Sequence, residues 1–191
     1  MSGDLIITSY QNVPLAEING FEIEYEQVFE AIMDSPNDLL VKFNYTETES
    51  EVIVNPGDTY INNIGTVVDA QSLLANGRDT RLQGQSDTIA NFQIGLDNLQ
   101  NQTQATLIVN YVSDRVRARG IDVLPDIIEE PPLLVDFAFS KIYSYPEFEL
   151  KLSLELRNLL DEEYYASMRN IAIYDQYDLG TSASLGFKIS F

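Results

Sequence analysis

Hydrophobic and polar residues alternate along most of this chain with a period of two. The alternation is cleanest at the end, where small or polar residues separate Ala183, Leu185, Phe187, Ile189 and Phe191. The segment from Phe148 to Arg157 places large apolar residues opposite charged residues and a serine in the same way. Because successive side chains of a strand point to opposite faces, each segment predicts a β-strand with one apolar face.

Earlier segments repeat this design and predict five more strands. They lie within residues 21–26, 41–46, 90–97, 105–111 and 135–140, and an eighth, shortened strand is expected within Leu5–Tyr10. Short connections at residues 31–38, 99–103 and 144–147 alternate with long loops expected at 54–87, 120–132 and 159–179. Short turns at one end and long loops at the other are typical of outer-membrane barrels.

The length and content of the apolar faces favour a membrane over water. In the last two predicted strands the apolar face is rich in Leu and Phe over the length that a tilted strand needs to cross a bilayer. Backbone groups in hydrocarbon must all pair internally, so a spanning sheet has to close into a barrel. We therefore interpret the chain as one all-β domain, an antiparallel up-and-down transmembrane β-barrel segment of seven to eight strands, forming an open part of a larger barrel.

Composition narrows the chemistry. The 191 residues include no His and no Cys, which removes the commonest metal ligand, the usual general base and thiol nucleophiles. We predict no catalytic, cofactor-binding or metal site, and we do not expect an enzyme. The net charge of −19 disfavours nucleic acid, whose phosphates need Lys and Arg.

Three segments carry a family resemblance. The stretch Asn158-Leu-Leu-Asp161-Glu-Glu-Tyr164-Tyr165 resembles the N-L-hydrophobic-D-x-x-Y-Y stretch near the end of TonB-dependent receptors. Upstream, Asn12 and the segment Ala16–Glu24, which contains Gly20 and Glu22, resemble a second element of that family. Asn110–Arg115 resembles a third, and the order of the three matches the family.

The resemblance implies an outer-membrane barrel of about 22 strands with a plug in its lumen. Such receptors take up scarce nutrients, often ferric siderophores, cobalamin or glycans, with energy passed on by TonB. We see no signal peptide, TonB box or plug in this sequence, so we expect residues 1–191 to be the C-terminal portion of the barrel. The expected partners are the rest of the receptor and, through it, TonB.

The last strand also resembles the C-terminal β-signal of bacterial outer-membrane proteins. Its residues would be Leu185, Phe187, Ile189 and the terminal Phe191. The barrel assembly machinery reads such a signal by pairing with an exposed strand. Chain ends are usually polar and loose, so a terminal Phe favours this interpretation over an ordinary last strand.

The strand after residue 105 suggests a contact with lipid. Continuing its period of two places Arg115, Arg117 and Arg119 on the outward face, above the apolar band. Arginines there could bind lipopolysaccharide phosphates. A solvated strand end, or a β-bulge that turns the face inward, would explain them equally well.

Two other groups have alternative interpretations. Glu22, Glu24 and Glu26 would form an inward acidic ladder, which either attracts cationic cargo or is an ordinary polar lining. Tyr164 and Tyr165 could contact substrate or belong to an interfacial aromatic girdle.

Two other classes of protein would also fit the predicted strand pattern. One is a complete small barrel of eight strands in the outer membrane, and the other is a soluble all-β binding module such as a jelly-roll carbohydrate binder. A Greek-key crossing between two packed sheets would favour the soluble module.

Overall fold

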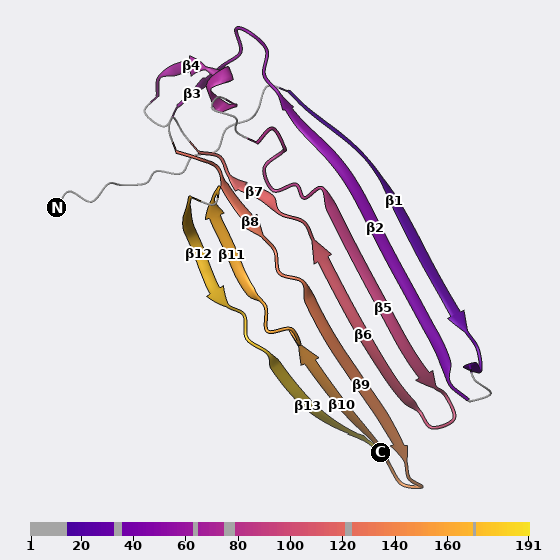
Figure 1. Cartoon of the computed structure of the whole chain (residues 1–191). Helices are drawn as coiled ribbons and strands as arrows, with labels where there is room; N and C mark the ends of the chain where they lie inside the picture. Colours follow the sequence, from indigo (N-terminus) through magenta and orange to yellow (C-terminus); the bar gives the residue numbers. More distant parts are fainter. Residues whose placement is uncertain (1–14, 33–35, 63–64, 75–78, 121–123, 170) are drawn as a thin grey trace, which may run out of the picture.

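The main element of the chain is one antiparallel sheet of seven strands (Figure 1). The computed structural model describes residues 15–32, 36–62, 65–74, 79–120, 124–169 and 171–191. The strands of the main sheet are β1 (Leu15–Phe29), β2 (Asp38–Ile53), β5 (Thr88–Asn98), β6 (Thr103–Val112), β9 (Leu134–Ser144), β10 (Glu149–Arg157) and β13 (Ser182–Ser190).

These strands pair in the order in which they occur along the chain, each antiparallel to its neighbours. The predicted up-and-down order is thereby confirmed, and no Greek-key crossing occurs among the described strands. β1 and β13 form the two edges, and no pairing joins them in the described part of the chain. The sheet is therefore open rather than a closed barrel.

A second sheet prolongs four of these strands at one end. It contains β7 (Arg115–Ala118), β8 (Ile127–Glu130), β11 (Glu163–Met168) and β12 (Ala172–Asp178), in the order β12-β11-β8-β7. A short hairpin of β3 (Thr59–Ile61) and β4 (Val67–Asp69), followed by one 3-10 turn, Ala70–Leu73, lies in the connection between β2 and β5. No helix among the described residues is long and apolar enough to span a membrane.

The observed strands extend those that the sequence predicts. All seven periodic segments form strands of the main sheet. The segment Leu5–Tyr10, expected to be an eighth strand, lies outside the described residues. The three expected long loops are wrong in part: β3 and β4 lie within 54–87, β8 lies within 120–132, and β11 and β12 lie within 159–179. The short turns between β5 and β6 and between β9 and β10 lie at the lower end in Figure 1, with the C-terminus.

Strand register brings the predicted apolar residues onto one face, which we call the apolar face. One row across the sheet is Tyr25, Phe43, Phe92, Val109 and Val135, in which each residue is the direct partner of the next. Further rows join Phe139 to Leu154 and Leu185, and Leu152 to Phe187. Since cross-strand partners share a face, the apolar residues of all seven strands form one continuous surface.

The opposite side, which we call the polar face, collects the intervening residues. One of its rows is Glu24, Asn44, Asn91 and Asn110, and the next is Glu26, Lys42 and Gln93. Amides, hydroxyls and charges therefore lie behind the apolar face along the whole sheet.

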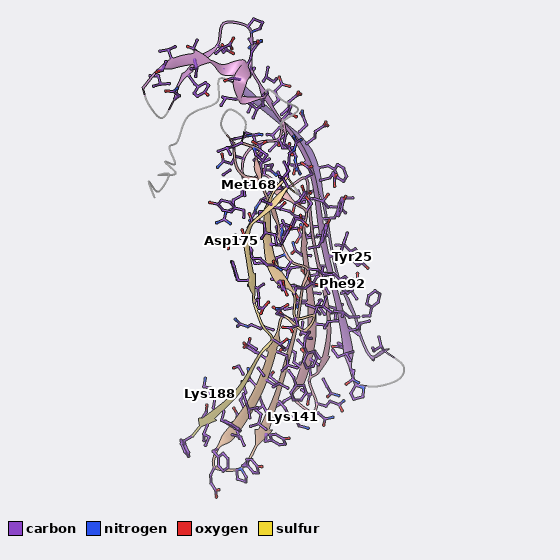
Figure 2. All side chains as sticks on the ribbon, turned by 60° about the vertical axis from the view of Figure 1, so that its left-hand side comes forward. Tyr25, Phe92, Lys141, Met168, Asp175 and Lys188 are labelled. Carbon is purple, nitrogen blue, oxygen red and sulfur yellow. The ribbon has the colours of Figure 1, made fainter. Side chains whose placement is uncertain are left out.

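No second layer formed by the described residues covers either face of the main sheet. Figure 2 shows a single curved and twisted sheet with side chains on both sides. Among the described residues only Val52, Ala70, Val116 and Ala166 are buried apolar residues. The accessible surface of 12925 Å² exceeds the roughly 9,200 Å² expected for a compact monomer of this size. The described residues therefore form no hydrophobic core of the size that a soluble domain of this length has.

Exposure of the apolar face follows from this architecture. Phe187 and Ile189 on the edge strand β13 are 67% and 55% exposed. Phe137, Leu150, Leu152 and Leu154 are half-buried, between neighbouring strands of the same sheet. Their outer surfaces meet no other protein element in the described part.

Candidate functional site

The motif residue Asn158 ties together three places where strands end. Its side chain donates hydrogen bonds to the carbonyl oxygens of Glu162 and Gly180, both 3.1 Å, and accepts one from the Glu162 amide at 3.0 Å. Its own amide donates to the Asp136 carboxylate at 2.9 Å. The buried asparagine therefore locks the end of β10 to β9 and to the start of β13.

The backbone explains why the motif uses Asn and Asp. Asn158 and Asp161 have φ angles of 53° and 54°, in the left-handed region. Asn and Asp tolerate that region better than other residues with a side chain. The two residues close a tight turn between β10 and β11, so the motif has a structural role here.

Tyr164 and Tyr165, the last residues of the motif, point to opposite faces of β11. Tyr164 stacks on Tyr177 with ring centroids 4.7 Å apart. Ala166 pairs with Glu129, and Glu129 pairs with Arg115, so these three residues share one face of the second sheet. This face continues the apolar face of the main sheet. Tyr164 lies two residues from Ala166 on β11 and therefore lies on the same face.

An arginine–tyrosine cluster surrounds Arg117. Its guanidinium lies 5.8 Å from the Tyr164 ring centroid and 5.5 Å from that of Tyr174. The same group donates to the Tyr164 hydroxyl at 2.9 Å and to the Asp175 carboxylate at 3.1 Å. This cluster therefore combines amphipathic aromatic rings with charged groups on the second sheet.

Arg115 forms the second ion pair of this surface. Its guanidinium donates to the Glu129 carboxylate at 2.7 Å. This hydrogen bond lowers the pKa of Glu129 and raises the pKa of Arg115. Both arginines thus have carboxylate partners, which leaves less positive charge for lipopolysaccharide phosphates than the sequence suggests.

Arg119 does not share the outward face expected for all three arginines, and this corrects the sequence prediction. The register between β7 and β8 shifts between Val116 and Ala118, which marks a β-bulge. An extra residue in one strand reverses the alternation beyond it. The Arg119 side chain consequently turns to the polar side, where it pairs with the fully buried Asp126 and donates to the carbonyl oxygens of Asp79 and Arg81.

The upstream motif residues Gly20 and Glu22 both lie at the pairing of β1 with β2. A Cβ atom at Gly20 would lie 2.4 Å from the Glu47 carbonyl oxygen and 2.6 Å from the Thr48 methyl carbon. Glycine is therefore required for the close approach of these strands. Glu22, on the polar face, accepts a hydrogen bond from the Asn44 amide.

The predicted β-signal residues lie on the free edge strand. Leu185, Phe187 and Ile189 are exposed on the apolar face, and Phe191 follows β13. The Phe191 ring lies 6.5 Å from that of Phe148, which stacks on Tyr145 at 4.7 Å. The strand offers both an open backbone edge and an apolar face to a partner.

Sequence reasoning missed a second arginine site, on the polar side. Arg81 forms ion pairs with Asp79 at 2.7 Å, Asp114 at 2.9 Å and Asp87 at 3.3 Å. Asp79 and Asp87 lie near Arg81 in the sequence, but Asp114 is 33 residues away, and a few aspartates around an arginine give no local signal of an ion-pair site. Burial alone would raise the pKa of Asp79, but the hydrogen bonds and charge of Arg81 lower it overall.

A hollow of about 490 Å³ lies beside the Arg81 clamp, the set of ion pairs between Arg81 and Asp79, Asp87 and Asp114. Its polar lining includes Asp79, Arg81, Asp114, Glu130 and Arg169. A second hollow, of about 240 Å³, lies over the Glu24 and Glu26 rows of the polar face. Both offer hydrogen-bond donors and acceptors to a hydrated, polar ligand.

The search for a metal-binding cluster and the comparisons with known proteins give two plain results. In the described residues, no group of three or more His, Cys, Asp or Glu side chains is placed to hold a metal ion. Comparisons with protein-family models, curated proteins and solved structures find no match to this chain. The resemblance to TonB-dependent receptors thus stays a prediction based on the motif residues.

Proposed function

We propose that this chain forms part of the wall of an outer-membrane β-barrel, and that the barrel is a TonB-dependent receptor for uptake of a scarce nutrient. One observation supports the membrane assignment above all others. A single-layer sheet carries a continuous apolar face that no protein element covers in the described residues. Monomeric soluble proteins rarely expose contiguous apolar patches larger than a few hundred Å².

Strand length agrees with a bilayer. β10 and β13 each contain nine residues, and β9 contains 11, while a tilted transmembrane strand needs about 9–11. The polar face then lines a hydrated interior, where Asn, Ser and charged residues are accommodated. The alternative soluble sandwich would need a second sheet packed on the apolar face, and the described chain has none there.

The uptake role rests on the motif residues and their positions. Asn158 and Asp161 shape the turn after β10, and Gly20 permits the close pairing of β1 and β2. In this proposal the partners are the remainder of the receptor, TonB acting through it, outer-membrane lipid with lipopolysaccharide, and the assembly machinery. Arg115 and Arg117 would meet the outer leaflet, and Arg119 would not.

Assembly in a Gram-negative host tests the proposal. The chain, supplied with a secretion leader, is expected in the outer-membrane fraction and resistant to extraction with urea. The Phe191→Asp variant should lose this localisation because it charges the end of the apolar face. The matched Ser190→Asp variant charges the polar face and should keep it. Recovery of the unmodified chain as a soluble periplasmic protein would contradict the proposal.

A further inference from the structure

The direction of the strands restricts how the sheet can be completed. Seven strands that are antiparallel to their neighbours place β1 and β13 in the same direction. Direct closure between these two edges would therefore need a parallel seam. An antiparallel up-and-down barrel has an even number of strands, so an odd number of additional strands must lie between β13 and β1.

The polar face at the β13 edge carries two like charges in direct opposition. Lys151 on β10 is the cross-strand partner of Lys188 on β13. Neither has a carboxylate within ion-pair distance in the described part of the chain. Like charges directly opposite each other destabilise a sheet, so this edge favours a neighbour that brings negative charge.

The other edge carries the opposite charge. Glu22, Glu24 and Glu26 follow one another on the polar face of β1. Glu26 pairs with Lys42 at 2.9 Å, and Glu22 accepts a hydrogen bond from Asn44. No ion pair to Glu24 is formed by the described residues. This edge favours a neighbour that brings positive charge.

We propose that the sheet is completed by a segment outside the described residues, with an odd number of antiparallel strands and oppositely charged ends. Its strand beside β13 carries Asp or Glu on the polar face opposite Lys188. Its strand beside β1 carries Lys or Arg opposite Glu24. This inference rests on the proposed function in treating the remaining strands as barrel strands, and it adds the charge that their two edge strands carry.

A second copy of the chain fits these edges poorly. A copy with the same orientation would place its β1 beside β13 in parallel. A copy related by a two-fold axis could pair β13 with β13 in antiparallel fashion, but it would bring a second Lys188 to the seam, with another Lys151 one strand behind it. The strand direction and the charge together favour an acidic antiparallel strand.

Strand peptides can test the β13 edge, because the chain has no Cys. The Ser184→Cys variant, refolded in detergent micelles, is mixed with a nine-residue peptide of alternating Leu and Ser. The peptide carries Glu at the position opposite Lys188 and Cys four residues further towards its C-terminus, which faces residue 184 only in antiparallel pairing. A matched peptide has Lys in place of Glu, and a third has its Cys four residues N-terminal to the Glu, as parallel pairing requires.

The proposal expects the Glu peptide to form the disulfide roughly fivefold faster than the Lys peptide, the ratio for a cross-strand charge effect of this kind. The parallel-register peptide should be slower than the Glu peptide. Replacing both Lys151 and Lys188 by Ser in the same variant should remove the preference for Glu.

Equal rates for the Glu and Lys peptides, or faster linkage of the parallel-register peptide, would overturn the proposal. A disulfide-linked dimer of the chain as the main product would assign the edge to a second copy instead. Either result in a chain that still inserts into membranes leaves the proposed function intact. A chain that stays soluble without detergent would refute that function separately.

Discussion

The Asn158 junction allows a quantitative prediction. Asn158 is 6% exposed, and its side chain makes three hydrogen bonds, two within the turn between β10 and β11 and one to the Gly180 carbonyl oxygen before β13. A net loss of about 1 kcal/mol for each hydrogen bond gives about 3 kcal/mol for Asn158→Ala. The φ angle of 53° adds about 1 kcal/mol for alanine, which lacks the local hydrogen bonding of Asn.

Two further variants separate these contributions. Asn158→Gly loses the hydrogen bonds but accepts the φ angle, so it should cost about 1 kcal/mol less than Asn158→Ala. Leu160→Ala, in the same turn and half exposed, should change stability by less than about 1 kcal/mol. The free energy of unfolding is measured by urea titration in detergent micelles, with far-ultraviolet circular dichroism as the signal. If Asn158→Ala cost no more than Leu160→Ala, the structural role assigned to the motif would be refuted.

Three further predictions use the same urea titration or amide exchange. Arg81→Met leaves its three aspartates without their cation and should cost about 2 kcal/mol, allowing for the partial exposure of two of them; a loss below about 0.5 kcal/mol would contradict the clamp. Arg115 lowers the pKa of Glu129 from 4.5, so their pair stabilises the fold above that pH and loses its effect as the pH falls below it. Between about pH 6 and pH 3, the urea midpoint should therefore drop less in Glu129→Gln than in the unmodified chain. Equal drops in the two proteins would contradict a stabilising role for the pair of Arg115 and Glu129. Gly20→Ala should speed amide exchange in β1 without affecting β10, because the new Cβ would collide with the Glu47 carbonyl. Unchanged exchange rates in β1 would show that its pairing with β2 does not require glycine at this position.

Sequence alone predicts the main sheet because its faces differ so strongly in polarity. Alternation between residues such as Leu152 and Ser153 identifies a strand and its apolar side without any tertiary information. Short turns between consecutive strands then predict antiparallel neighbours, and the observed order agrees. Register was not predicted, yet it follows from alignment of the apolar residues on one face.

The upper end of the sheet was harder to predict because its strands are irregular. β-bulges at Val116–Ala118 in β7 and opposite Ala166–Ser167 in β12 interrupt the period of two, so a strand there resembles a loop. The bulge in β7 also explains why Arg119 leaves the face of Arg117. The ion pair between Arg81 and Asp114 joins residues 33 apart in the sequence, so it can be found only once the strand pairing is known.

The most direct test of the account is whether lipid touches the apolar face and only that face. The chain has no Trp, so the neighbouring variants Leu185→Trp and Ser184→Trp each report one face of β13 at nearly the same depth. Both variants are refolded into phosphatidylcholine vesicles, with and without bromine on the acyl chains. We predict strong quenching of the Leu185→Trp emission by the brominated lipid and little quenching of the Ser184→Trp emission. Equal quenching of the two, or none in either, would contradict a sheet that crosses the bilayer with its apolar face towards lipid.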